Sequence, residues 1–194
     1  MAKKLTARGQ HRRDQLVATA ARRFAEHGYD PTSVADIVAD LGVGKGVFYW
    51  YFPSKEELLN EILRASQLEL RRAQQTAIGD EVDPLARIEI GLRTSMRWFA
   101  QHRQYFAIQQ LAAADERFAP TLRRNREVAI GDTMRHIKEV IVERELVDDD
   151  PELLAHAIHG VVDHLVRRCI IDGGEDTEQV ADAAVAFCRR GLGG

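Results

Sequence analysis

Apolar side chains near the N-terminus recur at the spacing of one helix face. Leu16, Ala20 and Phe24 stand four residues apart, which predicts an amphipathic helix over 12–27. A glycine follows directly, as is common where helices end. The polar, basic residues 1–11 lack this pattern. We expect them to form a flexible arm that reaches phosphates or a minor groove, or an ordinary tail.

Two short helices joined by a tight turn are predicted next. Ser33 and Asp36 have the spacing of a capping box, which marks a helix start. Gly42 ends this helix, and the next one begins at Lys45. That second helix has to end before Pro53, which disfavours helical geometry in its predecessor. Two such helices form a helix-turn-helix, whose second helix can lie in the major groove of DNA.

The second short helix has more aromatic side chains than one face can bury. Phe48 and Phe52 are four residues apart and should point inward. Tyr49 and Trp50 are then left on the outer face, beside Lys45. Large exposed aromatic side chains favour a partner surface. The alternative is that all of these aromatics belong to the core.

The rest of the chain is also predicted to be helical. The expected helices are 55–75, 84–102, 104–114, 120–145, 152–171 and 177–190. The predicted fold class is therefore all-α. We divide the chain into a three-helix N-terminal domain with its basic arm, 1–54, and a larger helical body, 55–194.

The last two helices carry more apolar surface than a single core needs. The helix over 152–171 is apolar around more than half of its circumference. The helix over 177–190 has two apolar stripes, Val180-Ala184-Phe187 and Ala181-Val185-Cys188. This pattern predicts a homodimer packed as a four-helix bundle. A thicker monomer core is the alternative.

Charge is unevenly distributed along the chain. Residues 1–55 contain nine Lys and Arg against five acids, a net charge of +4, although the whole chain carries −3. The remaining residues therefore carry −7. A basic end on an acidic body is typical of proteins that dock one end on phosphates.

Residues 13–58 resemble the N-terminal DNA-binding domain of the TetR family of transcriptional regulators. The matching runs are Ala20-Ala21-x-x-Phe24-x-x-x-Gly28, Thr32-Ser33-Val34-x-Asp36-Ile37, and Gly42-Val43-x-Lys45-Gly46-x-Phe48-Tyr49-x-Tyr51-Phe52-Pro53-Ser54-Lys55-Glu56-Glu57-Leu58. Gly44, Val47 and Trp50 depart from the family's usual Ser, Thr and His. These positions lie near DNA in the family, so the departures affect the target sequence.

Double-stranded DNA is thus the expected partner. Hydroxyls and free amides at a helix start suit phosphates, and a valine can meet a thymine methyl. The candidates are Thr32, Ser33, Lys45, Tyr49 and Lys55 for phosphates, Val47 and Trp50 for bases, and Gly44 and Gly46 for close backbone approach.

The resemblance also implies a small-molecule pocket among the middle helices of the body. The candidate lining residues are Trp98, Phe99, Tyr105, Phe106, Gln109 and Met134, with His159 and Asp163 as polar anchors. Because aromatic residues and Met dominate this set, we expect a small apolar or aromatic effector. The alternative for each residue is an ordinary core position.

One polar cluster in the body has a spacing that chemistry could use. His156, His159 and Asp163 stand at i, i+3 and i+7 and share one helix face. They could hold a divalent metal, but such groups more often line a core, pocket or interface. We therefore expect no metal and no cofactor.

Composition limits the remaining possibilities. The chain has no apolar run long enough for a membrane span and no apolar leader, so we expect a cytoplasmic protein without a membrane partner. Its two cysteines, Cys169 and Cys188, do not suggest a disulfide framework. The sequence predicts a homodimeric, ligand-responsive repressor that binds a near-palindromic operator and is not an enzyme. The alternatives are a small-molecule or metal sensor whose DNA-binding domain is secondary, and an all-α enzyme that uses the histidine cluster.

Overall fold

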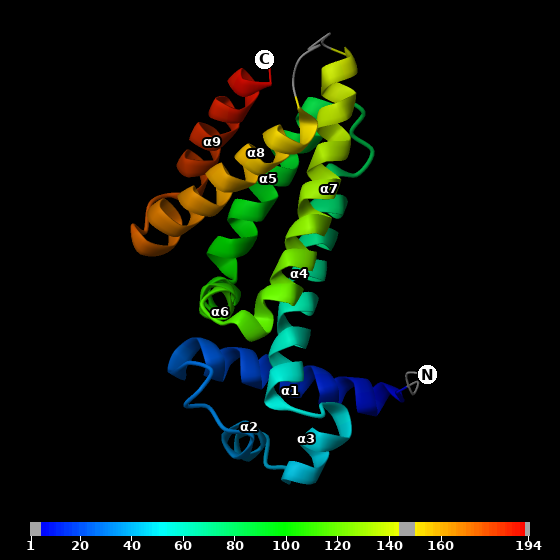
Figure 1. Ribbon diagram of the computed structural model, residues 1–194, viewed down its shortest axis with the longest axis vertical. Coiled ribbons are helices and arrows are strands. Elements are labelled where there is room, and N and C mark those ends of the chain that lie inside the picture. Colours follow the sequence, from blue (N-terminus) through cyan, green and yellow to red (C-terminus); the bar gives the residue numbers. More distant parts are fainter. Residues whose placement is uncertain (1–4, 144–149, 193–194) are drawn as a thin grey trace. The chain divides into compact units, whose positions relative to one another are not determined.

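The computed structural model describes residues 5–143 and 150–192, and every secondary-structure element in these ranges is helical. The chain folds as two compact units. The first unit comprises Met1–Ser66 and Gln104–Leu122, and the second comprises Gln67–Arg103 and Arg123–Gly194, as far as their residues are described. Figure 1 traces the helices, of which α4 (Lys55–Ile78) and α7 (Ala119–Glu143) each contribute residues to both units. The all-α prediction is confirmed.

The first helix begins earlier than its apolar pattern predicts. Helix α1 spans Ala7–His27, because Thr6 caps it by accepting a hydrogen bond from the Gly9 amide at 3.2 Å. The expectation of a flexible arm is therefore wrong for residues 7–11. It lies outside the described residues for 1–4. A polar helix start carries no apolar periodicity, which is why the pattern missed it.

The helix-turn-helix forms as predicted from α2 (Val34–Asp40) and α3 (Lys45–Tyr51). Asp36 accepts from the Ser33 amide at 2.8 Å, and the Asp36 amide donates to the Ser33 hydroxyl at 3.2 Å, which completes the capping box. Gly42 takes a positive φ of 61°, where a side chain would add strain. Helix α3 ends at Tyr51, two residues before Pro53.

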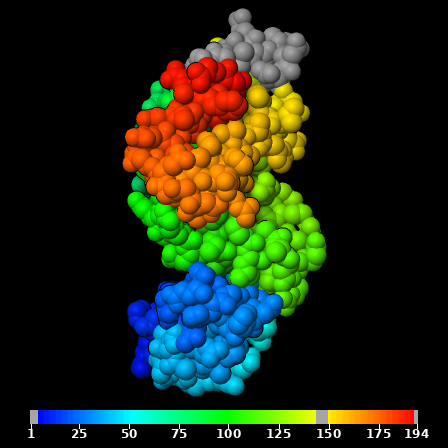
Figure 2. Space-filling view, turned by 90° about the vertical axis from the view of Figure 1, so that its left-hand side faces the viewer, coloured from blue at the N-terminus to red at the C-terminus, as the bar shows by residue number. Residues whose placement is uncertain are grey.

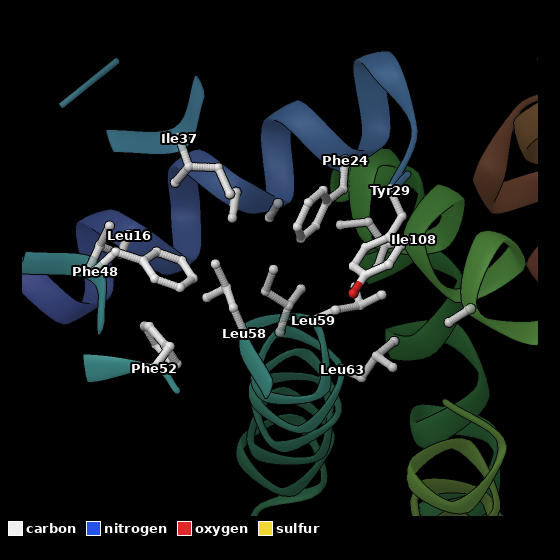
Figure 3. Packing of buried hydrophobic residues seen from close by; sticks show 14 of the residues in the cluster. Leu16, Phe24, Tyr29, Ile37, Phe48, Phe52, Leu58, Leu59, Leu63 and Ile108 are labelled. Carbon is white, nitrogen blue, oxygen red and sulfur yellow. The ribbon is translucent and has the colours of Figure 1, made fainter. Parts of the chain in front are cut away.

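The first unit is built around one apolar cluster that includes an element from later in the chain. Helices α1 to α4 contribute Leu16, Phe24, Ile37, Phe48 and Leu58. Helix α6 (Arg103–Ala113) adds Ile108 and Ala112, and the short 3₁₀ segment η1 (Glu116–Phe118) adds Phe118. Figure 3 shows side chains from these helices meeting at a common centre. The cluster holds α1 behind the helix-turn-helix, which fixes the orientation of α3.

Ion pairs add to the contact between α1 and α2. Asp40 accepts from Arg22 at 2.6 Å and from the Nε of Arg23 at 2.7 Å. The Arg23 hydrogen bond, helped by Arg22, lowers the pKa of the Asp40 carboxyl to about 2. The carboxylate therefore stays charged down to that pH, and its contribution to stability is lost only as the pH falls from about 4 toward 2.

The second unit packs α5 (Pro84–Gln101) against α8 (Pro151–Leu165), the π-helical segment η2 (Val166–Asp172) and α9 (Thr177–Gly191). The buried stripe of α5 consists of Leu85, Ile88, Leu92, Met96 and Phe99, which recur at helical spacing. Arg97 on α5 binds Glu178 on α9 through two hydrogen bonds of 2.6 Å. Among the described helices none is long and apolar enough to cross a bilayer.

Three details of the body differ from the apolar pattern. The helix expected over 152–171 continues from Val166 as a π-helix, and Gly174 with φ 68° follows it. Leu68 on α4 is 46% exposed although it is a large apolar residue within a helix. The buried positions of α4 there are Leu63, Ser66 and Leu70, which places Leu68 on the opposite side. Phe187 is 60% exposed, although its stripe partners Val180 and Ala184 are buried.

Candidate functional site

Helix α3 presents one buried face and one exposed face. Phe48 is fully buried and Phe52, just after the helix, is nearly so, whereas Tyr49 and Trp50 are each 55% exposed. Lys45 is also exposed. A Cβ added at either of the exposed glycines, Gly44 or Gly46, would meet no atom within 4 Å. The predicted division of α3 into an inner and an outer face is confirmed, and the outer face combines aromatic, cationic and open backbone surface.

A groove of about 510 Å³ lies between the start of α1 and the outer face of α3. From α1 it is lined by Thr6, Arg8, Gly9 and Arg12, and from α3 by Gly46, Val47, Trp50 and Tyr51. No described carboxylate forms an ion pair with Arg8, Arg12 or Lys45. Unneutralised guanidinium groups beside exposed aromatic rings suit a phosphate backbone with adjoining bases.

Sequence reasoning missed Arg8 and Arg12 as individual candidates. It counted them in the net charge but assigned them to a flexible arm. The signal that could have found them is Thr6, whose hydroxyl starts α1 one turn earlier. With the helix extended, both arginines stand on a rigid element next to α3.

Three residues predicted to contact DNA use their side-chain polar groups in hydrogen bonds within the protein. The Thr32 side chain is buried and donates to the Gly28 carbonyl at 2.8 Å. The Ser33 hydroxyl donates to Asp36 at 2.6 Å within the capping box. The Lys55 ammonium donates to the carbonyls of Tyr29 at 2.7 Å and Thr32 at 2.9 Å.

Lys55 also lies over the Tyr29 ring, with its nitrogen 4.1 Å from the ring centroid. Burial is the main cause of a lowered pKa of the Lys55 ammonium. Its position joins the start of α4 to the loop between α1 and α2. The side chain thus acts in this structure as an internal clamp, and its ammonium is not directed at an outside phosphate.

The second unit contains a cavity of about 110 Å³ between α4, α5, α7 and α8. Its apolar lining consists of Ile78, Ile88, Leu92, Ala129 and Val162, with Gly91. Its polar lining consists of Gln67, Arg71, Gln74, Gln75, Arg87, Ser95, Asp132, Thr133, Arg135, His136 and His159. The cavity is therefore far more polar than the aromatic set predicted from the sequence.

The structure does not bring the predicted ligand residues together. Of the predicted residues, His159 alone lines this cavity, while Met134 lines a second cavity formed by residues of α7 and α8. Trp98 stacks on His102 at 4.4 Å between ring centroids, and Phe99 is buried. Tyr105, Phe106 and Gln109 belong to α6 in the first unit, and Asp163 pairs with Arg126 at 3.3 Å.

The histidine cluster is divided between the two cavities. His159 lines the first and His156 lines the second. Among the described residues, no group of three His, Cys, Asp or Glu side chains could hold a metal ion. These three residues share one helix face by spacing, but this alone does not direct their side chains to one point.

His159 makes the stability of the chain depend on pH. Burial, with Arg126 and His156 nearby, lowers its pKa from 6.5 to about 4, and its Nε2 lies 2.9 Å from the Thr133 hydroxyl. The unfolded chain binds this proton near pH 6.5 and the folded chain only near pH 4, so stability falls as the pH drops through this range.

We expect acidification from pH 7 to 5 to lower the free energy of unfolding by about 2 kcal/mol through His159. Urea unfolding at both pH values measures the loss. A His159→Gln variant should lose clearly less on acidification. An equal loss in this variant would assign the effect to other groups, of which His136 is the first candidate because burial also lowers its pKa.

Comparison with known proteins places the N-terminal part of the chain. Residues 16–62 match the family model for bacterial regulatory proteins of the tetR family. A protein described as a probable acrEF/envCD operon repressor of Escherichia coli K12 is 34% identical over 103 residues, which are 52% of this chain and 46% of that protein. The transcriptional repressor KstR2 of Mycobacterium tuberculosis H37Rv is 32% identical over 99 residues, 51% of this chain and 50% of that protein.

The chain thus spans about half the length of the curated relatives it matches. A crystal structure of a TetR-like transcriptional regulator from Rhodococcus sp. RHA1 superposes with a TM-score of 0.79 at 22% identity, covering 98% of this chain and 100% of that one. This second likeness concerns the fold. Residues 16–62 thus match the tetR family of bacterial regulatory proteins, and the fold of the chain is similar to that of a TetR-like regulator.

Proposed function

We propose that this protein is a DNA-binding transcriptional regulator and that it acts as a repressor. The observation that carries the proposal is the outer face of α3, where exposed Tyr49 and Trp50 stand beside Lys45 and the Arg8–Arg12 groove. The relatives are repressors by name, which supports repression over activation. In this proposal residues 1–54 bind DNA, and 55–194 bind an effector and dimerise.

Contacts to DNA are proposed only for residues that line the Arg8–Arg12 groove or are exposed at the start or on the outer face of α3. Lys45, Tyr49, Arg8 and Arg12 approach phosphates, since they are charged or polar and form no ion pair with an acid among the described residues. Trp50 and Val47 approach bases, and the open glycines Gly44 and Gly46 let the backbone come close. We do not carry forward Thr32, Ser33 and Lys55 as side-chain contacts, because their polar groups already bond within the protein.

A homodimer is proposed through α8 and α9. These helices lie side by side on one face of the second unit, as the orange and red surface in Figure 2 shows. Leu153 is 67% exposed and Phe187 60% exposed, and the small residues Ala157, Gly160, Ala183 and Ala186 are exposed beside them. Burying this apolar surface between two copies would form the four-helix bundle.

A dimer of this kind would read a near-palindromic operator. Its two α3 helices would contact half-sites roughly 34–36 Å apart, or a simple multiple of that spacing. An effector in the second unit would favour the arrangement that does not fit DNA. A coupling of about 1–3 kcal/mol between the two sites is ordinary for such regulators.

The second candidate function is small-molecule sensing in which DNA binding is secondary. The polar cavity of the second unit favours it, since it is a ready ligand site whatever α3 does. We do not retain the all-α enzyme, because the named relatives are transcriptional regulators.

Salt dependence of DNA binding tests the electrostatic part of the proposal. If Arg8, Arg12 and Lys45 of two subunits each meet a phosphate, the log–log slope of affinity against salt should be roughly −5. Arg12→Gln should make the slope shallower by about 2, because two contacts are lost per dimer.

The matched control is Arg72→Gln, which removes the same charge at an exposed position of α4 in the second unit. It should leave the slope unchanged. Fluorescence anisotropy with a labelled duplex at several salt concentrations gives these values. A flat slope for the parent, or equal effects of the two variants, would contradict the proposed contacts.

A further inference from the structure

The cavity of the second unit holds more positive than negative charge. Three guanidinium groups line it, from Arg71, Arg87 and Arg135, against the single carboxylate of Asp132. The guanidinium of Arg87 already has partners outside the lining. It donates to Glu139 at 2.7 Å and to the carbonyls of Glu81 and Val82 at 2.7 and 2.9 Å. The excess therefore resides in the remaining two arginines.

Asp132 is shared between these two arginines, which come from different helices. Arg71 on α4 binds it through Nε at 2.6 Å and Nη2 at 3.0 Å. Arg135, one turn further along α7, binds the same carboxylate at 3.0 Å. One negative charge thus serves two positive ones. If a second carboxylate took Arg71, Asp132 would keep a partner on its own helix.

The other polar groups of the cavity are neutral. Burial lowers the pKa of both His136 and His159, so each imidazole is uncharged at neutral pH. The Nδ1 of His136 is buried and has no hydrogen-bond partner among the described residues. A buried imidazole nitrogen without a partner costs free energy, and a ligand oxygen would relieve that cost. Among the described residues of the lining, Asp132 is the only acidic one.

Part of the cavity lining is apolar. It includes Ile78, Ile88, Leu92 and Val162. The cavity of about 110 Å³ is smaller than the engineered apolar cavity of about 150 Å³ that holds benzene, so it suits one compact apolar group. The lining thus combines a place for one anion with a place for one compact apolar group.

We propose that this cavity binds a small organic monocarboxylate whose carboxylate takes the Arg71 guanidinium from Asp132, while its apolar body rests on Ile88, Leu92 and Val162. The inference rests on the proposed function in taking this cavity as the effector site. The exchange replaces one carboxylate by another on Arg71, so no charge is left unpaired. It also removes the ion pair that ties α4 to α7 within the second unit.

Calorimetric titration of the full chain with benzoate and with benzamide tests the proposal. The two probes have nearly the same size and differ in charge. At matched ionic strength and neutral pH, benzoate should bind at least tenfold more tightly than benzamide. Equal affinity, tighter binding of benzamide, or no binding of benzoate would overturn the proposal.

Two variants separate the roles of the ion-pair partners. Arg71→Gln should weaken benzoate at least tenfold and abolish its advantage over benzamide. Asp132→Asn should tighten benzoate several-fold, because it removes the competitor for Arg71. Unchanged affinity in Arg71→Gln would place the anion elsewhere. Weaker binding in Asp132→Asn would make Asp132 part of the ligand site, and either result overturns the exchange.

Arg97→Gln is the matched control, since Arg97 pairs with Glu178 and does not line the cavity. It should leave benzoate binding unchanged. Thermal unfolding by circular dichroism verifies that each variant is folded, and Arg71→Met, which also removes the charge, replaces Arg71→Gln if the latter is not. Calorimetry needs no DNA. If the parent protein binds benzoate but no DNA, the proposed function alone is refuted. If it binds DNA but no benzoate, this inference alone is refuted.

Discussion

Replacing Lys55 with Met should lower the free energy of unfolding by about 2–4 kcal/mol. The ammonium donates to the carbonyls of Tyr29 and Thr32 and lies over the Tyr29 ring. Met keeps the apolar stem and removes the charge, so it leaves the two carbonyls without their donor. Urea unfolding at a fixed protein concentration, followed by circular dichroism, measures the loss.

Lys45→Met is the matched control for this prediction. Lys45 is exposed at the start of α3 and has no described acid partner. Its replacement should change stability by less than about 0.5 kcal/mol and should weaken DNA binding. If Lys55→Met were as stable as the parent and weakened DNA binding instead, Lys55 would be a phosphate contact as the sequence suggested.

Replacing Tyr49 with Ala should reduce operator affinity at least tenfold with little change in the thermal midpoint. The ring is 55% exposed on the outer face of α3. Its loss therefore removes contact surface for DNA and little of the core. Anisotropy titrations and thermal unfolding of the same preparation give both quantities.

Tyr49→Phe separates the ring from its hydroxyl. If the hydroxyl meets a phosphate, this variant should lose part of the affinity that Tyr49→Ala loses. A large fall in the thermal midpoint of Tyr49→Ala would instead show that the ring, which packs edge-on against Phe48 at 5.3 Å, is a core element.

The helix-turn-helix could be predicted nearly residue by residue because its signals are local. The Ser33–Asp36 box, the turn at Gly42 and the stop before Pro53 each depend on one or two backbone positions. The spacing of Phe48 and Phe52 likewise determines which face of α3 is buried. Such features need no knowledge of distant residues.

The effector cavity could not be predicted in this way. Apolar periodicity marks the stripe of α5, but it does not mark Arg71, Gln74 or Asp132, which also face inward. Their placement at the cavity depends on partners far away in the chain, as the Arg71–Asp132 pair shows. Aromatic content directed attention to Tyr105 and Phe106, whose helix α6 belongs instead to the first unit.

Thr32 and Lys55 illustrate the same limit within the DNA-binding part. Their residue types suit phosphate contacts, and a motif cannot show that their polar groups are already bonded. Arg8 and Arg12 were missed for the converse reason, since helical structure at the start of α1 depends on the Thr6 cap.

Selection of bound sequences from a random pool of duplex DNA, with the purified protein at moderate salt, tests the central proposal most directly. We predict enrichment of one near-palindrome whose half-site centres are roughly 34–36 Å apart, or a simple multiple of that distance. No enrichment by a protein shown to be folded and dimeric would contradict the assignment of α3 as a DNA-reading helix.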